Sequence, residues 1–251
     1  MYWVIERMKL NLKVAAHFKK STLIQIAGMI LNDLFWVGSI FLIFYNLPSF
    51  YGMSVRDYLQ AYGFFLASMG LSTTVFGGLK NGFESIVEGK MERYLTRPAS
   101  PLLQLALRKI QPDSIGDFLL GITVLAVSGA SPRLIALLPF GFALYTLVWI
   151  TTISAYFFIN DTTQASRNAI FFGITSFSHW PSFVLPDWLK PLPYVILPGA
   201  MASFYPVKIA KGEASLIPLL LVLTLHAILA LLLWKEGLKR YMPRTWMDYQ
   251  E

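Results

Sequence analysis

The chain has 251 residues, of which 55% are hydrophobic and only 14% are charged. Soluble domains carry about a quarter charged residues, and this composition instead predicts one polytopic membrane domain over residues 1–251. There is no cysteine, which excludes a disulfide framework, thiol chemistry and a cysteine-ligated metal. The net charge of +7 is explained by basic residues that flank apolar runs, so we expect no nucleic-acid partner.

Residues 1–20 mix basic and apolar residues along the whole segment. A cleavable signal peptide would place a basic patch before an apolar core, so this segment does not resemble one. We predict an amphipathic helix that lies in the membrane interface and leads into the first span. An ordinary charged N-terminus without membrane contact is the alternative. The apolar face of the predicted helix carries Trp3, Val4, Met8, Leu12 and Ala15.

Long apolar runs predict an all-α membrane protein with six transmembrane helices. Each run is long enough to cross about 30 Å of hydrocarbon at 1.5 Å per residue, except the third, which is marginal. The fifth span starts near Ala169 and runs into His179, Trp180 and Pro181. The other five spans cover residues 22–45, 58–79, 114–130, 134–159 and 215–234.

Basic residues are distributed unevenly between the predicted loops. If both termini lie inside and six spans alternate, 16 of the 21 lysine and arginine residues fall on the inner side. The positive-inside rule therefore favours an N-in, C-in orientation. An odd number of spans would place the basic tail outside.

Residues 180–212, before the last predicted span, are rich in proline and aromatic residues. Six prolines lie between residues 181 and 206, which excludes one straight helix. We predict short re-entrant or interfacial helices on the outer side, where non-helical backbone needs protein or water around it. An amphipathic outer loop with an aromatic belt is the alternative.

Residues 84–101 form a short charged segment between two apolar runs. A helix over residues 84–96 would place an apolar stripe on one side, at i, i+4, i+7 and i+8. Pro98 and Pro101 would end this helix. The stripe consists of Val87, Met91, Tyr94 and Leu95.

Motifs for nucleotide or hydrolytic chemistry are absent from the sequence, which contains no GxxxxGK[ST], HExxH or GxSxG. The three histidines are too far apart in sequence to suggest a local metal site. Polar residues inside the predicted spans are candidates for a translocation path or a subunit interface. Alternatively, Asp33 is neutral or bonded to a neighbouring hydroxyl, and His226 is merely tolerated. The candidates are Asn32, Asp33, His179 and His226.

Residues 86–102 read IVEGKMERYLTRPASPL. This segment resembles a motif of ABC-2 type permeases, the membrane subunits of ABC exporters. In one branch of that family, the loop between the second and third spans reads close to I-x-x-G-x-L-D-x-x-L-x-[RK]-P-x-[SN]-P-L. Met91 and Glu92 depart from this pattern but keep its bulk and charge. The likeness continues through Asp113 to Gly116, and reappears at Trp180-Pro181, Leu185-Pro186 and Pro198.

The resemblance implies a permease of an ATP-driven efflux system, integral to a bacterial cytoplasmic (inner) membrane. Its partners would be cytoplasmic ATPase subunits and a second permease subunit, identical or different. The ATPase subunits would bind ATP and Mg²⁺, so the chain itself would be no enzyme and hold no cofactor, metal or catalytic residue.

The resemblance also implies that residues 84–101 form a cytoplasmic coupling helix that sits in a cleft of the ATPase. Met91, Tyr94 and Leu95 would anchor in the groove, while charged residues at its rim would fix the orientation. The coupling residues would be Ile86, Glu88, Gly89, Met91, Glu92, Tyr94, Leu95, Arg97 and Pro98.

Two further functions are open at this point. An ion-coupled secondary transporter would use Asp33 and His226 as its relay. A non-transporting membrane scaffold would require nothing of residues 86–102 beyond solubility, since a charged loop is usually only a connector.

Overall fold

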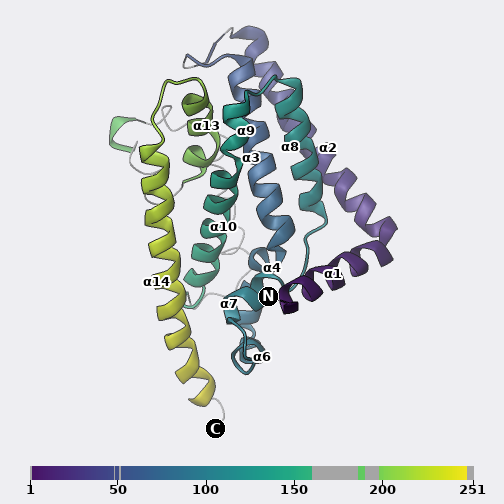
Figure 1. Cartoon of the computed structure of the whole chain (residues 1–251), viewed down its shortest axis with the longest axis vertical. Coiled ribbons are helices and arrows are strands. Elements are labelled where there is room, and N and C mark those ends of the chain that lie inside the picture. The colour runs from purple at the N-terminus through teal and green to yellow at the C-terminus, as the bar shows by residue number, and fades with distance from the viewer. Residues whose placement is uncertain (1, 48, 51, 160–185, 190–197, 248–251) are drawn as a thin grey trace.

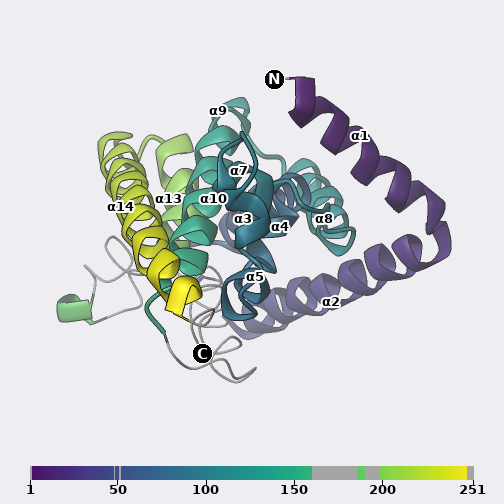
Figure 2. The ribbon, with the colours of Figure 1, turned by 90° about the horizontal axis from the view of Figure 1, so that it is seen from below.

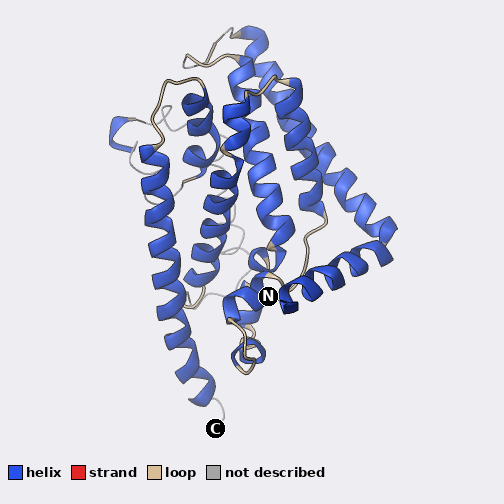
Figure 3. Cartoon of the chain, in the orientation of Figure 1, coloured by secondary structure: helices blue, strands red, loops and turns tan. Residues whose placement is uncertain are grey.

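The computed structural model describes residues 2–47, 49–50, 52–159, 186–189 and 198–247. These residues form helices and loops and no named strand, which confirms the prediction of an all-α protein (Figure 3). In chain order the helices are α1 (Tyr2–His17), α2 (Lys19–Asn46), α3 (Val55–Val75), α4 (Gly77–Lys80), α5 (Phe83–Val87), α6 (Glu92–Leu95), α7 (Pro101–Ala106), α8 (Asp113–Val127), α9 (Pro132–Ala136), α10 (Leu138–Ala155), η2 (Asp187–Leu189), α13 (Gly199–Ala210) and α14 (Ile217–Met247).

Among the described residues, three helical segments are long and apolar enough to cross a membrane. They are Lys19–Tyr45, Pro132–Ala155 and Ile217–Tyr241, and they coincide with the first, fourth and sixth predicted spans. The second and third predicted spans fall on α3 and α8. With 15 residues, α8 is about 22 Å long, shorter than the hydrocarbon core of a bilayer. The fifth predicted span lies outside the described residues, as does His179.

The central helix of the bundle is α3, which is buried on nearly all sides by α2, α8, α10 and α13 (Figures 1 and 2). It begins at a capping box in which Ser54 and Asp57 bond reciprocally. Where α3 crosses α8, a Cβ placed on Gly121 would lie 2.8 Å from the carbonyl oxygen of Gly63. The two backbones therefore meet directly, and small residues at this crossing let α3 occupy the centre.

At the side of the bundle, α1 and α2 meet at an angle near Phe18 (Figure 2). The predicted N-terminal helix is present as α1, and its side toward the protein carries Arg7 and Asn11, which bond the loop after α7. Its apolar side chains are left outward, since Trp3 is 38% exposed and Leu12 is 58% exposed. This arrangement leaves an apolar face free for a membrane surface.

Buried side chains form three clusters along the bundle. The one we call the loop-end core joins the loop between α4 and α8 to the adjacent ends of α10 and α14. A second lies between α3, α8, α10, α13 and α14, and a third around the start of α3. The loop-end core consists of Leu79, Ile86, Met91, Tyr94, Leu105, Ala106, Trp149, Ile153, Tyr156, Phe157, Trp234 and Tyr241.

The described part of residues 180–212 contains two short helices, η2 and α13. Although it has only 12 residues and contains Pro206, α13 packs closely against α3. Its residue Val207 is fully buried. Residues 180–185 and 190–197 lie outside the described residues.

Candidate functional site

The segment that we name the charged loop, residues 83–106, lies at one end of the bundle and contains α5, α6 and α7 (Figure 1). The prediction of one helix over residues 84–96 is wrong. Gly89 has φ +69°, a left-handed conformation that interrupts the helix between α5 and α6. Pro101 occupies the first turn of α7, where a missing N–H costs nothing, so it starts a helix.

The apolar residues of the charged loop face inward, onto the protein itself. Met91 is fully buried and Tyr94 is 5% exposed, both within the loop-end core. The backbone N–H of Met91 also donates to the hydroxyl of Tyr241 on α14 at 3.3 Å. Ile86 is buried in the same core and Leu95 packs against it.

The expectation that Met91 and Tyr94 anchor in a partner's groove is therefore wrong, and Leu95 has little surface left for one. The ends of α10 and α14 offer these side chains an aromatic surface within the same chain, including Trp149 and Trp234. Burial there removes their apolar area from water without any partner.

The outward edge of the charged loop is polar. Glu92 is half-buried, and Glu88 pairs with Lys90 on the surface. Arg97 is exposed and makes no hydrogen bond or ion pair with any other described residue. This polar edge comprises the exposed residues Glu88, Gly89, Lys90, Arg93, Thr96, Arg97 and Pro98.

Hydrogen bonds tie the charged loop to itself and to α1. Gln104 Nε2 donates to the carbonyl oxygens of Tyr94, at 3.1 Å, and of Ala99, at 2.7 Å. Just beyond α7, Arg7 Nη2 donates to the carbonyl of Arg108 at 3.0 Å, and Asn11 Nδ2 to that of Leu107 at 3.1 Å. The loop is thus held between α1 and the ends of α10 and α14.

Beneath the polar edge, two arginines converge on one serine. Arg93 Nη2 lies 3.2 Å from Ser85 Oγ, and Arg108 Nη1 lies 3.1 Å from the same oxygen. Ser85 itself is fully buried. Sequence reasoning noted neither Ser85 nor the role of Arg108, because residues 8 and 23 positions apart from Ser85 share no local pattern.

Within the spans, Asp33 on α2 is 3% exposed and accepts a hydrogen bond from the hydroxyl of Tyr62 at 3.4 Å. The side chain of Asn32 also bonds Asp33, at 3.4 Å. The structure thus agrees with the alternative in which Asp33 bonds a neighbouring hydroxyl. Asp117 on α8, buried beside Asp33, was missed, although it is the one acidic residue of the third predicted span.

His226 on α14 is also buried, and its Nδ1 lies 2.9 Å from the carbonyl oxygen of Val222 in the same helix. The helix α14 packs mainly on α10, whereas α2 packs mainly on α8. The structure therefore does not bring His226 and Asp33 together as one polar site.

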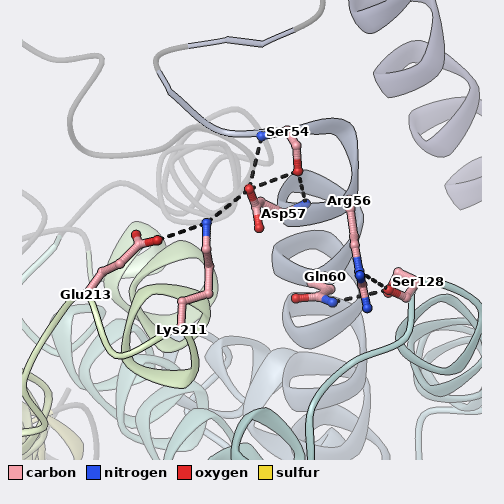
Figure 4. Close-up of polar contacts among 7 residues, drawn as sticks. All are labelled: Ser54, Arg56, Asp57, Gln60, Ser128, Lys211 and Glu213. Carbon is pink, nitrogen blue, oxygen red and sulfur yellow. Dashed lines mark hydrogen bonds and ion pairs between the residues drawn. The ribbon is translucent and has the colours of Figure 1, made fainter.

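At the opposite end of the bundle, a second polar cluster joins α3 to α8 and α13, and we name it the end clamp (Figure 4). Arg56 donates to the carbonyls of Ser128 and Gly129, both at 2.8 Å, and Gln60 donates to the same two oxygens. Sequence reasoning missed this cluster, whose members are Ser54, Arg56, Asp57, Gln60, Ser128, Gly129, Lys211 and Glu213.

Lys211, just after α13, completes the end clamp. Its ammonium lies 2.9 Å from a carboxylate oxygen of Glu213 and 3.3 Å from one of Asp57. The hydrogen bond to Glu213, together with the charge of Asp57, raises the pKa of Lys211 above its ordinary value. The cations of the end clamp therefore have their partners within the chain.

In a comparison with protein families, residues 28–244 match a family described as "ABC-2 family transporter protein". The match includes the charged loop, the buried Asp33 and Asp117, and the end clamp. No curated protein and no solved structure matches the chain.

Proposed function

Because the chain belongs to the ABC-2 family of transporter proteins, we propose that it is the membrane-spanning permease subunit of an ATP-driven exporter. The chain forms the translocation path together with a second permease subunit. Separate cytoplasmic ATPase subunits bind ATP with Mg²⁺ and hydrolyse it, since the sequence carries no P-loop motif. The permease therefore receives the energy of ATP hydrolysis as movement of the ATPase against its cytoplasmic surface.

The observation that carries this proposal is the two-sidedness of the charged loop. Its apolar side is buried in the loop-end core, and its polar edge is exposed. A connector that served only solubility would need no packed apolar side. We assign the polar edge to the contact with the ATPase, through charged and polar residues such as Arg93 and Arg97.

The attachments of the charged loop explain how movement of the ATPase reaches the membrane. Met91 and Tyr94 pack against the ends of α10 and α14, and Arg108 is bonded to α1 by Arg7. Packed side chains transmit displacement because protein interiors are close-packed. A push on the polar edge therefore displaces α1, α10 and α14 together.

The proposed topology has six spans with both termini in the cytoplasm of a bacterium. The positive-inside rule gives this orientation. Arg7 near the N-terminus and Tyr241 near the C-terminus both contact the segment 91–108, which supports an even number of spans. In this arrangement the charged loop is cytoplasmic and the end clamp faces outward.

The second permease subunit, a copy of this chain or a different one, covers the outward face of α2. That face is continuous and apolar, and α2 is near the edge of the bundle in Figure 2. Lipid covers whatever part of the face the second subunit leaves open. Its exposed residues include Leu31, Leu34, Phe35, Phe41 and Leu42.

The experiment uses full-length tagged chain purified in detergent from the cells that encode it. We expect an ATP-hydrolysing subunit to be recovered with the wild type and lost with Arg97→Glu. Arg133→Glu is the matched control, because Arg133 is exposed on α9, close to the end clamp. Recovery of equal ATPase activity with Arg97→Glu would refute the assignment of the polar edge, and no ATPase with wild type would refute the function.

A further inference from the structure

Two arginines, one in the charged loop and one just beyond it, share a single neutral acceptor. Arg93 Nη2 and Arg108 Nη1 are hydrogen-bonded to the same atom, Ser85 Oγ, at 3.2 and 3.1 Å. Their guanidinium groups are therefore near neighbours. Neither makes an ion pair with a carboxylate of the described residues, whereas Lys80, Lys90 and Lys211 each do.

Like charges at this separation repel, and one hydroxyl cannot neutralise them. A guanidinium carries five N–H donors, and the contact to Ser85 uses one on each arginine. The remaining donors form two planar forks close to each other, an arrangement that suits a carboxylate or a phosphate. Arg93 is further fixed by its position over the Tyr94 ring, 4.9 Å from the centroid.

The place of the two arginines indicates the source of the anion. Arg93 belongs to the polar edge, which we assign to the ATPase contact, and the half-buried Arg108 bonds the same buried hydroxyl of Ser85. The exposed residues of this edge carry an excess of positive charge, since Lys90, Arg93 and Arg97 are basic and Glu88 is acidic. An acidic partner surface is complementary to this edge.

We propose that Arg93 and Arg108 together receive one acidic side chain of the ATPase subunit, with Ser85 holding both guanidinium groups in place. This inference rests on the proposed function and names the chemistry of its contact. The carboxylate neutralises one of the two positive charges and offsets their repulsion. It also couples the ATPase to α1, because the backbone carbonyl of Arg108 is bonded to Arg7.

The test compares ATPase activity recovered with wild-type chain and with the double variant Arg93→Gln/Arg108→Gln. We expect the double variant to recover at least tenfold less ATPase activity than wild type, because both guanidinium forks are removed. The matched control is Lys235→Gln/Lys239→Gln, which removes two exposed charges at the same end of the bundle. We expect the control to stay within twofold of wild type.

Two further measurements separate the contact from folding and from lipid binding. The double variant should keep the wild-type melting temperature in detergent. Arg93→Lys/Arg108→Lys, which keeps charge but loses the forks, should recover intermediate activity. Phosphatidylglycerol retained by each protein is measured by mass spectrometry, because an anionic headgroup would also suit two guanidinium groups.

Each outcome decides between the two proposals. Wild-type chain that recovers no ATPase overturns the proposed function. A double variant that recovers as much ATPase as wild type overturns only the arginine site, and if it also loses phosphatidylglycerol, the anion is a lipid headgroup. Loss of ATPase together with a lowered melting temperature overturns the site as well, because the arginines would then be structural.

Discussion

The two ends of the bundle satisfy their charged groups in different ways. At the end clamp, Arg56 bonds two backbone carbonyls and Lys211 lies between two carboxylates, so the cations have partners within the chain. At the charged loop, Arg93 and Arg108 share one hydroxyl, and Arg97 is exposed without a described partner. One end is closed on itself, and the other leaves charged groups that the proposed ATPase contact would complete.

The apolar parts of the two ends also differ. The loop-end core contains several aromatic residues of α10 and α14, and it fixes a segment with only short helices of its own. Around the end clamp, the long helix α3 is already capped by Ser54 and Asp57. The charged loop therefore depends on tertiary packing for its shape, and the end clamp depends on polar contacts between helix ends.

The largest expected effect is at the charged loop. Met91→Ala removes a fully buried side chain and should lower the free energy of unfolding by about 2–5 kcal/mol, because a cavity remains. We expect a lower melting temperature and faster tryptic cleavage after Arg93. Lys90→Ala is the control, since its side chain is exposed. Unchanged stability and cleavage in Met91→Ala would show that the loop does not depend on this core.

The second-largest expected effect is a loss of stability at the end clamp. Arg56→Ala/Gln60→Leu removes every side-chain donor that the structure gives to the carbonyls of Ser128 and Gly129. Leaving a buried acceptor unsatisfied costs about 1–3 kcal/mol. Each single variant should cost less than half of the double variant, since the other donor still reaches both oxygens. Additive single effects in thermal unfolding would contradict this shared role.

A smaller effect is expected for Ser85→Ala, which removes the acceptor common to Arg93 and Arg108. The stability change should be about 0.5–1.5 kcal/mol, the net value of an ordinary hydrogen bond. Recovery of ATPase should fall more clearly, as the guanidinium groups lose their fixed position. Ser100→Ala is the control, because Ser100 is exposed. Equal ATPase recovery in both variants would separate Ser85 from the contact.

The smallest expected effect concerns Lys211, whose contribution to the stability of the folded protein depends on pH. Since the folded-state pKa of Lys211 is raised, its ion pairs stabilise the protein fully below the ordinary lysine value of about 10.4. Lys211→Met should therefore be slightly less stable than wild type at pH 7, with a free energy of unfolding lower by about 0–1 kcal/mol, the value of an exposed pair. The difference should vanish as the pH rises through the folded-state pKa. A difference that persists there would point to packing of the side chain instead.

The sequence alone predicted the class of protein, because hydrophobic composition and the length of apolar runs are local properties. Its first, fourth and sixth predicted spans coincide with helices that can cross a membrane. The motif around Arg97 and Pro98 also indicated the family, since a motif is a short run of neighbouring residues that can be read without the structure.

Only the tertiary structure decided which side of the charged loop faces outward. The spacing of Met91 and Tyr94 shows that they share a face, but an apolar face can bury itself in a partner or in its own chain. Ser85, Arg93 and Arg108 come together for the same reason, because the turn at Gly89 and the packing of α7 bring distant positions to one point. Contacts between residues far apart in sequence depend on how the helices pack, which local spacing does not encode.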